Sequence, residues 1–326
     1  MSYGTTARWS IATTTAILVL AGACGLADDS DAVPETAAPQ AAGAEPGVVD
    51  IVAQDLIFIA PDTISPGWTT FRFTNAAPMI HFAVVERMPE GIGAAEQQEL
   101  VAPIFQEGLD LLVEGDVDAA MARFGALPPW FGEIAFLGGP GFTSPGEVSE
   151  ATVYLEPGTY LLECYVKTDG IFHSYNPNPE MYGMVHEFAV VGSDTGTPEP
   201  TASMHLTISS ENGIVMEGAA RPGEHTIGVH FEDQTVHENF VGHDVHLVRL
   251  TADVDLTELE RWMDWSQPDG LNSPAPAHFL GGLNEMPAGT TGYFTVVLDP
   301  GEYAWIAEVP AAREKAMLIP FTVEGG

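Results

Sequence analysis

From residue 48 onward, short apolar or alternating runs rich in valine, isoleucine, threonine, phenylalanine and tyrosine are separated by Pro-Gly and Gly-Gly pairs. Alternation of apolar and polar residues with a period of two predicts half-buried β-strands. Many short strands with turn signals between them are typical of a β-sandwich or a β-barrel. The pattern therefore predicts an all-β fold for this part of the chain.

The same short segments occur twice, in the same order. The five pairs are Ile64–Thr69 with Ala220–His225, His81–Arg87 with His243–Arg249, Phe136–Gly139 with Phe279–Gly282, Leu155–Tyr160 with Leu298–Tyr303, and Gly183–Val190 with Ala316–Val323. Five matches in one order indicate a tandem duplication. We predict two domains, at 48–191 and 203–324, joined by a linker at 192–202.

Each copy interrupts its strands with one segment of helical periodicity. The apolar positions are Leu100, Ile104, Leu109, Leu112 and Val117 within residues 94–124 of the first copy, and Leu259, Trp262 and Met263 within Leu256–Trp265 of the second. Apolar residues three to four positions apart form one stripe on a helix. We expect both stripes to pack against the sandwiches rather than to contact a cofactor.

The N-terminus has the layout of an export signal. Arg8 is followed by the apolar run Ile11–Leu20, which is too short for a spanning helix, and then by small residues up to Cys24. The ending Leu20-Ala-Gly-Ala-Cys24 resembles a lipobox, which implies that residues 1–24 are a signal peptide and that Cys24 is lipidated. Ordinary cleavage nearby and an uncleaved anchor are the alternatives. Residues 25–47, rich in alanine, proline and acidic residues, predict a flexible tether. We expect an exported, membrane-anchored lipoprotein that faces the periplasm or the cell exterior.

The chain is strongly acidic, with 46 aspartates and glutamates against 10 lysines and arginines and a formal charge of −36. Such a surface repels phosphate backbones, so we predict no nucleic-acid partner. It favours a basic partner protein, or a salty environment that screens self-repulsion.

The folded part has one cysteine, Cys164, because Cys24 belongs to the export signal. No disulfide can form within it, so the thiol is either buried and inert or bound to something. His81 lies upstream of Cys164, and His173 and Met184 follow it. One thiolate, two imidazoles and one thioether are the donors of a blue-copper site.

At these residues the chain resembles the cupredoxins, the family of plastocyanin and azurin. The resemblance is sharpest at Asn75 before His81 and along the run from Pro157 to Met184. It implies two tandem Greek-key cupredoxin-like β-sandwiches, each with a short helical insertion. It also implies one type 1 copper in the first copy, with ligands His81, Cys164, His173 and an axial Met184.

The spacing of these ligands departs from that of the small cupredoxins. Eight residues separate Cys164 from His173, and ten separate His173 from Met184, where the family has two to four. A longer loop costs more entropy to order. Met181 and His186 therefore remain open as substitutes for Met184 and His173.

The second copy lacks the thiolate. His243 and Met317 match His81 and Met184, but Ala307 stands at the position of Cys164. No blue-copper site can form there. The surplus histidines of this copy are either surface residues or ligands of a cysteine-free site.

The pattern as a whole predicts a type 1 copper protein that passes single electrons, with a basic redox protein such as a cytochrome as its partner. Oxidases and nitrite reductases with two cupredoxin domains use His-x-His or His-Cys pairs for a second copper centre, and this chain has none. We therefore expect a protein that is not an enzyme. The alternatives are a binding or structural module of the cell envelope without metal, and copper carriage or storage.

Overall fold

The computed structural model describes residues 47–178 and 180–325, which belong to one compact unit. The predicted signal peptide, the lipidation site Cys24 and nearly all of the predicted tether lie outside the described residues. Within the described part, no helix is both long and apolar enough to cross a bilayer.

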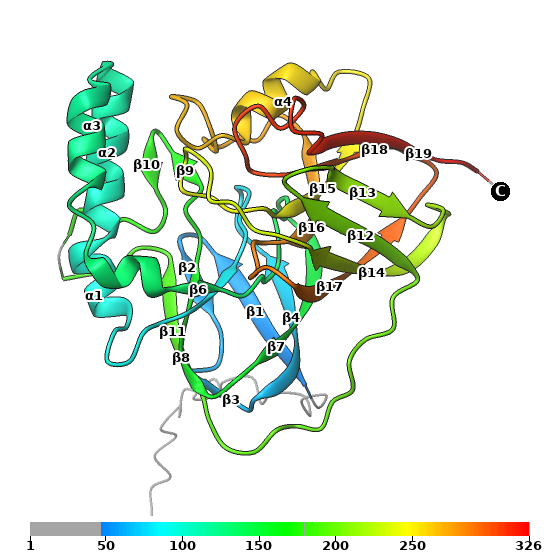
Figure 1. Ribbon diagram of the computed structural model, residues 1–326, viewed down its shortest axis with the longest axis horizontal. Helices are drawn as coiled ribbons and strands as arrows, with labels where there is room; N and C mark the ends of the chain where they lie inside the picture. Colours follow the sequence, from blue (N-terminus) through cyan, green and yellow to red (C-terminus); the bar gives the residue numbers. More distant parts are fainter. Residues whose placement is uncertain (1–46, 179, 326) are drawn as a thin grey trace, which may run out of the picture. The chain divides into compact units, whose positions relative to one another are not determined.

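Residues 48–191, here called the first half, form two sheets (Figure 1). One sheet has the order β2-β1-β4-β7 and the other the order β3-β11-β8-β5-β6. Phe71 of β4 packs edge-on against Phe188 of β11 at 6.1 Å, so aromatic rings from the two sheets meet in the core. The strands are β1 Val48–Gln54, β2 Ile57–Ile59, β3 Thr63–Ile64, β4 Gly67–Asn75, β5 Val84–Arg87, β6 Ala135–Phe136, β7 Val148–Leu155, β8 Gly158–Glu163 and β11 Val185–Val190.

Residues 203–324, the second half, repeat this architecture. Their strands lie in the orders β13-β12-β14-β17 and β16-β15-β18-β19. Phe294 of β17 meets Trp305 of β18 at 5.9 Å between the two sheets. The strands are β12 Met204–Ser209, β13 Gly213–Glu217, β14 Gly223–Phe231, β15 Val245–Leu250, β16 His278–Leu283, β17 Thr290–Leu298, β18 Gly301–Ile306 and β19 Leu318–Val323.

The second half repeats the strands of the first, except that β3 has no counterpart in it. The first strand of each half runs parallel to the long strand after the hairpin (β1 with β4, β12 with β14), and β3 runs parallel to β11. The remaining pairs named above are antiparallel. The expected all-β fold of two tandem β-sandwiches is confirmed. The domain boundaries at 191 and 203 stay a prediction.

The halves share one continuous sheet. Strands β7 and β17 pair antiparallel, with Tyr293 opposite Thr152, which joins two four-stranded sheets into one of eight strands. The repeated Gly-Gly pairs lie at this junction, where Gly141 N–H donates to Gly282 O at 3.2 Å. Gly139 and Gly282 have φ of 100° and 142°, and a Cβ on either would clash with backbone carbonyl oxygens. Glycine is required at both positions because Gly139 lies directly against the carbonyl of Ala83 and Gly282 against that of Val245.

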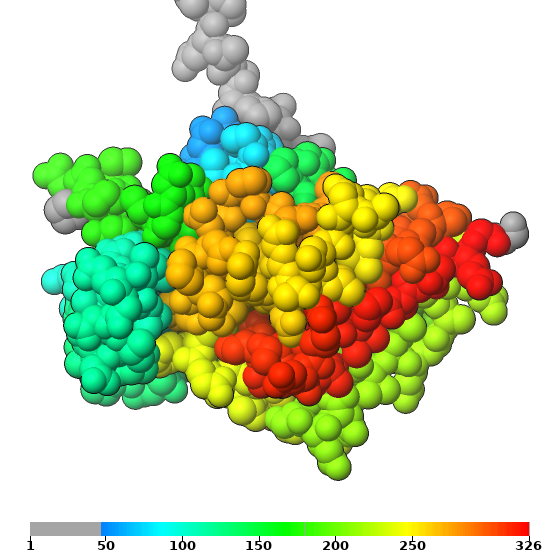
Figure 2. Space-filling model, turned by 90° about the horizontal axis from the view of Figure 1, so that it is seen from above, coloured from blue at the N-terminus to red at the C-terminus, as the bar shows by residue number. Residues whose placement is uncertain are grey.

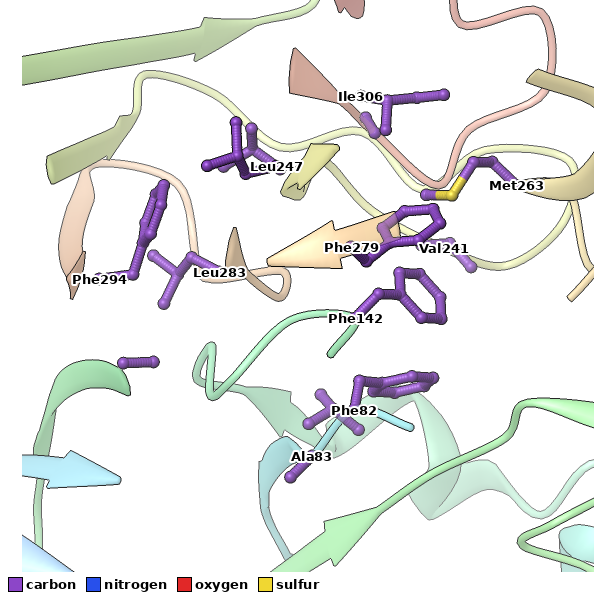
Figure 3. Packing of buried hydrophobic residues seen from close by; sticks show 14 of the residues in the cluster. Phe82, Ala83, Phe142, Val241, Leu247, Met263, Phe279, Leu283, Phe294 and Ile306 are labelled. Atoms are coloured by element: carbon purple, nitrogen blue, oxygen red, sulfur yellow. The ribbon is translucent and has the colours of Figure 1, made fainter. Parts of the chain in front are cut away.

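Phe142 fills the space between the halves (Figure 3). Its ring lies 4.9 Å from Phe82 of the first half and 5.4 Å from Phe279 of the second, and it is fully buried. The hydrophobic core therefore runs through both halves without a break.

The helical insertions lie where the sequence predicts them. The first consists of α1 Ala94–Leu100, α2 Ala102–Glu114 and α3 Val117–Phe124, followed by the 3₁₀ turn η1 Pro129–Glu133; the second is α4 Leu256–Trp262. Ile104, Leu109 and Leu259 are buried as expected. Leu100 and Val117 are exposed, because they sit at the ends of short helices whose inward faces are supplied by other residues. A small hairpin of β9 Lys167–Thr168 and β10 Ile171–Phe172 completes the structure.

Replacing Phe142 by alanine should lower the free energy of unfolding by about 3–5 kcal/mol, because a buried aromatic ring leaves a cavity. Since the ring touches both halves, one cooperative transition should shift as a whole in denaturant unfolding followed by tryptophan fluorescence. Val236→Ala, a truncation at a side chain that is 68% exposed, is the control and should change little. Two separated transitions in the wild-type chain would contradict a shared core.

Candidate metal centre

His81 is held by a turn at the end of β4. The alternating burial of that strand places Asn75 inside, where its Nδ2 donates to Met79 O at 2.8 Å and to Thr143 O at 2.7 Å. Its Oδ1 accepts from Ala77 N–H. His81 then exchanges backbone hydrogen bonds with Thr143 in both directions. The amide of Asn75 thus fixes the turn that presents His81.

A hairpin returns His173 to the side of Cys164. Cys164 follows β8 directly, and strands β9 and β10 pair across the two-residue turn Asp169-Gly170, both with positive φ. Positive φ at both turn residues matches the twist of a hairpin. His173 N–H then donates to Val166 O at 2.8 Å. The long spacing between Cys164 and His173 is therefore taken up by ordered strands.

Met184 is tied into the same backbone network. Its N–H donates to His173 O at 2.6 Å, and its carbonyl oxygen accepts from Cys164 N–H at 3.2 Å. Met184 is fully buried. Gly183, just before it, lies so close to the carbonyl of Ser174 that any Cβ would clash. The loop from His173 to Met184 closes because position 183 has no side chain.

Helices of the first insertion hold this loop from outside. Gln106 of α2 accepts from Phe172 N–H at 2.9 Å, and Gln98 of α1 accepts from Gly183 N–H at 2.7 Å. The second half contributes Asn272, whose side chain accepts from Gly170 N–H at 3.0 Å. The helices and the second half supply none of the predicted copper ligands. Their side chains instead bind the backbone of the segment that carries His173 and Met184.

The structure brings His81, Cys164 and His173 together. Their ligand atoms all lie within 4.8 Å of one another, and all three residues are buried. The Nδ1 atoms of both rings face the sulfur, at 3.4 Å for His81 and 3.9 Å for His173. The ring centroids are 4.9 Å apart. Two imidazole nitrogens and one sulfur thus converge on one point.

Burial sets the protonation of this group. It raises the pKa of the Cys164 thiol to about 12, although the backbone amides of Phe82 and Val166 act in the opposite direction. Burial lowers the pKa of His81 to about 4 and, with the neighbouring His81 ring, that of His173 to about 3. At neutral pH both imidazoles are therefore neutral and carry a free lone pair, as metal ligands must.

The residues fit copper. A thiolate with two neutral imidazoles is the equatorial donor set of a type 1 site, and Met184 is the thioether nearest in the backbone network. His173 Nε2 lies 2.9 Å from the hydroxyl of Thr168, so its second nitrogen is occupied and its Nδ1 is left for the metal. The role of Met184 as axial ligand stays a prediction.

The two substitute residues lie away from this group. The side chain of Met181 is 58% exposed, and His186 Nε2 lies 3.3 Å from Pro61 O. The group within 4.8 Å includes His173 and not His186.

The second half has the same backbone hydrogen bonds as the metal centre but lacks two of its ligand side chains. Ala307 N–H donates to Met317 O, and Met317 N–H donates to Ala312 O, as Cys164, Met184 and His173 do in the first half. Alanines thus occupy the positions of the cysteine and of the second histidine.

His246, one of the surplus histidines of the second copy, lies in a further buried group with Asp244 and Glu308, which the sequence pattern did not connect with it. His246 Nδ1 accepts from Phe142 N–H at 3.2 Å, and its Nε2 lies 2.8 Å from Asp244 Oδ2. Both ring nitrogens are already in use. The group therefore links the two halves and offers no free imidazole to a metal.

No protein-family model matches the chain, and no curated protein matches it. Among solved structures it is similar to reduced auracyanin from the photosynthetic bacterium Roseiflexus castenholzii, at 16% identity and a TM-score of 0.25 over 46% of this chain and 100% of that one. It is also similar to the blue copper oxidase from Nitrosomonas europaea, at 12% identity and a TM-score of 0.22 over 85% of each chain. The Cu-containing nitrite reductase from Thermus scotoductus is 10% identical, with a TM-score of 0.20 over 86% of this chain and 61% of that one. Such slight likeness assigns no activity, so the copper site rests on the geometry of its three side chains.

The expectation that the protein is not an enzyme is corrected by these similar structures, because an oxidase and a nitrite reductase are among them. The expectation was drawn from the lack of His-x-His and His-Cys pairs in the sequence. That reasoning considered only residues adjacent in the sequence, whereas residues far apart also meet in the folded chain, as Asp244 and Glu308 do across 64 positions. Polar side chains can therefore form a buried cluster even where the sequence has no adjacent pair of ligand residues.

Replacing Thr168 by valine should weaken copper binding by about 10- to 100-fold, because His173 loses the partner that fixes its ring. The measurement is a competition titration against a chelator of known affinity. Thr168→Ser keeps the hydroxyl and should bind nearly as the wild type does. Equal affinities for the valine and serine variants would show that the hydroxyl does not orient the ring.

Proposed function

We propose that the first half holds one type 1 copper and that the protein passes single electrons. The observation that carries this proposal is the convergence of two neutral imidazole nitrogens on one buried sulfur at 3.4 and 3.9 Å. Bound copper would supply one-electron oxidation and reduction. Cys164, His81 and His173 would hold it, with Met184 as a fourth, weaker ligand.

The surrounding residues suit this task because they keep the ligands rigid and dry. His81 and Cys164 are 0% exposed and His173 is 3% exposed. Asn75 fixes the turn that presents His81, Thr168 orients the ring of His173, and the backbone network fixes the loop. A site that does not rearrange and excludes water keeps the cost of each electron transfer low.

We further propose a basic redox partner, such as a cytochrome, and a lipid anchor at Cys24. The support for the partner is the formal charge of −36, which attracts a cationic protein over a distance set by the ionic strength. The support for the anchor is the lipobox-like ending of the signal segment. Such an anchor would keep the copper domain at the membrane surface on the outer side.

Addition of Cu(II) to the full chain should produce an intense visible band from thiolate-to-copper charge transfer, with one copper per chain. His173→Gln should abolish the band, because the equatorial set loses one of its two imidazoles. His186→Gln, which removes a histidine outside the site, should leave it intact. Tight Cu(I) binding without colour would instead support copper storage, and a chain that takes up no copper would support a metal-free binding module.

The rate of electron transfer to a basic cytochrome should fall by about tenfold or more as salt rises from about 10 mM to about 200 mM, because the attraction is screened. Stopped-flow mixing of the reduced copper protein with the oxidised cytochrome measures this rate. An acidic cytochrome of similar potential is the control and should react faster as salt rises. A rate independent of salt would count against electrostatic steering.

A further inference from the structure

A second feature of the molecule lies at the end of β8, beside the residues that flank Cys164. There a cavity of about 70 Å³, partly open to solvent, is enclosed by strands β5 and β8, helices α1 and α2, and segments of the second half. Figure 2 shows the helical insertion lying against the segments near residues 240 and 265 that close this region. The sequence neighbours of Cys164, Glu163 and Tyr165, line the cavity, whereas Cys164 itself belongs to the metal centre.

Three glutamates line this cavity without a basic partner. They are Glu86, Glu163 and Glu285, and none of the described residues lining the cavity is a lysine or an arginine. Glu86 is 3% exposed and Glu163 is 7% exposed. Burial and the nearby Glu163 and Glu285 raise the pKa of Glu86 well above its usual value, and burial raises that of Glu285 to about 8. Among the described lining residues, no basic side chain offsets the charge that these carboxyls carry when they are ionised.

Two oxygens of side chains that line the cavity have no hydrogen-bond partner among the described residues. They are Glu86 Oε2 and Gln97 Oε1, and both residues are 3% exposed. Gln97 is oriented by its Nε2, which donates to Glu163 Oε2 at 2.6 Å. A buried acceptor without a donor costs about 1–3 kcal/mol, so a ligand that donates hydrogen bonds or brings positive charge would recover this cost.

Aromatic rings form the rest of the wall. Phe105 of α2 lies 5.6 Å from Phe131, 5.8 Å from Phe240 and 5.8 Å from Trp265. All four rings line the cavity. Aromatic faces attract cations that carry an apolar surface, and several such faces around one space are typical of sites for organic ammonium groups.

We propose that this cavity binds a small organic ammonium cation, with its N–H groups on the oxygens of Glu86 and Gln97 and its carbon atoms against the aromatic wall. An inorganic divalent cation fits less well. Among the described residues, Glu86, Glu163 and Glu285 do not form a group whose oxygens all lie within 4.8 Å of one another, and aromatic carbon offers a hard ion no ligand. A neutral ligand would gain nothing from ionisation of these carboxyls, whereas a cation stabilises their charged forms.

The test is titration of the full chain with methylammonium chloride in phosphate buffer, because amine buffers would compete. Calorimetry gives the affinity, and tryptophan fluorescence reports on Trp265. Saturable binding of one cation per chain is expected. Glu86→Gln should weaken it at least tenfold, whereas Glu99→Gln, which removes an exposed carboxylate from the helix that carries Gln97, should not change it. Phe105→Leu keeps an apolar side chain without a π face and should weaken binding by about threefold to tenfold.

Further measurements distinguish binding of the cation from binding of copper and from misfolding of a variant. Binding should persist in copper-free protein and in Cys164→Ala, so failure of the copper site leaves the test intact. Thermal unfolding of Glu86→Gln shows whether that variant folds, and Glu285→Gln gives a second removal of charge. Methanol, a neutral molecule of similar size, should not bind measurably. The proposal is overturned if methanol binds as well as methylammonium, if Glu86→Gln and Glu99→Gln bind alike, or if Mn²⁺ fills the site and excludes methylammonium.

Discussion

The placement of Cys164, His173 and Met184 depends on hydrogen bonds that distant parts of the chain supply. The loop that connects them loses much conformational entropy when it is fixed. Its ends are joined by the backbone bonds between Cys164, Met184 and His173, and its middle folds into the β9–β10 hairpin. Glutamines of α1 and α2 bind its backbone from one side, and the second half binds it from the other. The helical insertion and the second half can thus be understood as supports for three ligands.

Lys167 shows how closely the second half is tied to this loop. It is fully buried, and its Nζ donates to the backbone oxygens of Trp265 at 2.8 Å and Gln267 at 3.1 Å. Burial lowers its pKa to about 8, although the charge of Asp264 acts in the opposite direction. A charged group held by carbonyl oxygens across the junction orients the hairpin and costs less than an unpaired buried charge. The second half thus has the fold of the first without its thiolate, and it holds the hairpin that leads to His173.

The metal centre and the carboxylate cavity share one stretch of chain at the end of β8. Glu163, the last residue of that strand, lines the cavity together with Tyr165, whereas Cys164 between them belongs to the metal centre. A change of charge in the cavity therefore lies one residue from the thiolate. Tyr165 also donates to Glu308 at 3.2 Å, which links this strand to the polar group that joins the halves.

The sequence by itself determined the parts that depend on local pattern. The alternation of apolar residues predicts the strands, the five repeated segments predict two copies of one sandwich, and the donor types at His81, Cys164 and His173 predict a copper site. Local pattern could not show that the hairpin at Asp169-Gly170 brings His173 back to Cys164, nor that the two copies merge through β7 and β17 into one sheet. Nor could it show that Glu86 and Glu285 face one cavity, because they are far apart in sequence and look like ordinary surface carboxylates. Burial and proximity are properties of the packed chain, and only the tertiary structure decides which polar groups lose their water and which partners they find.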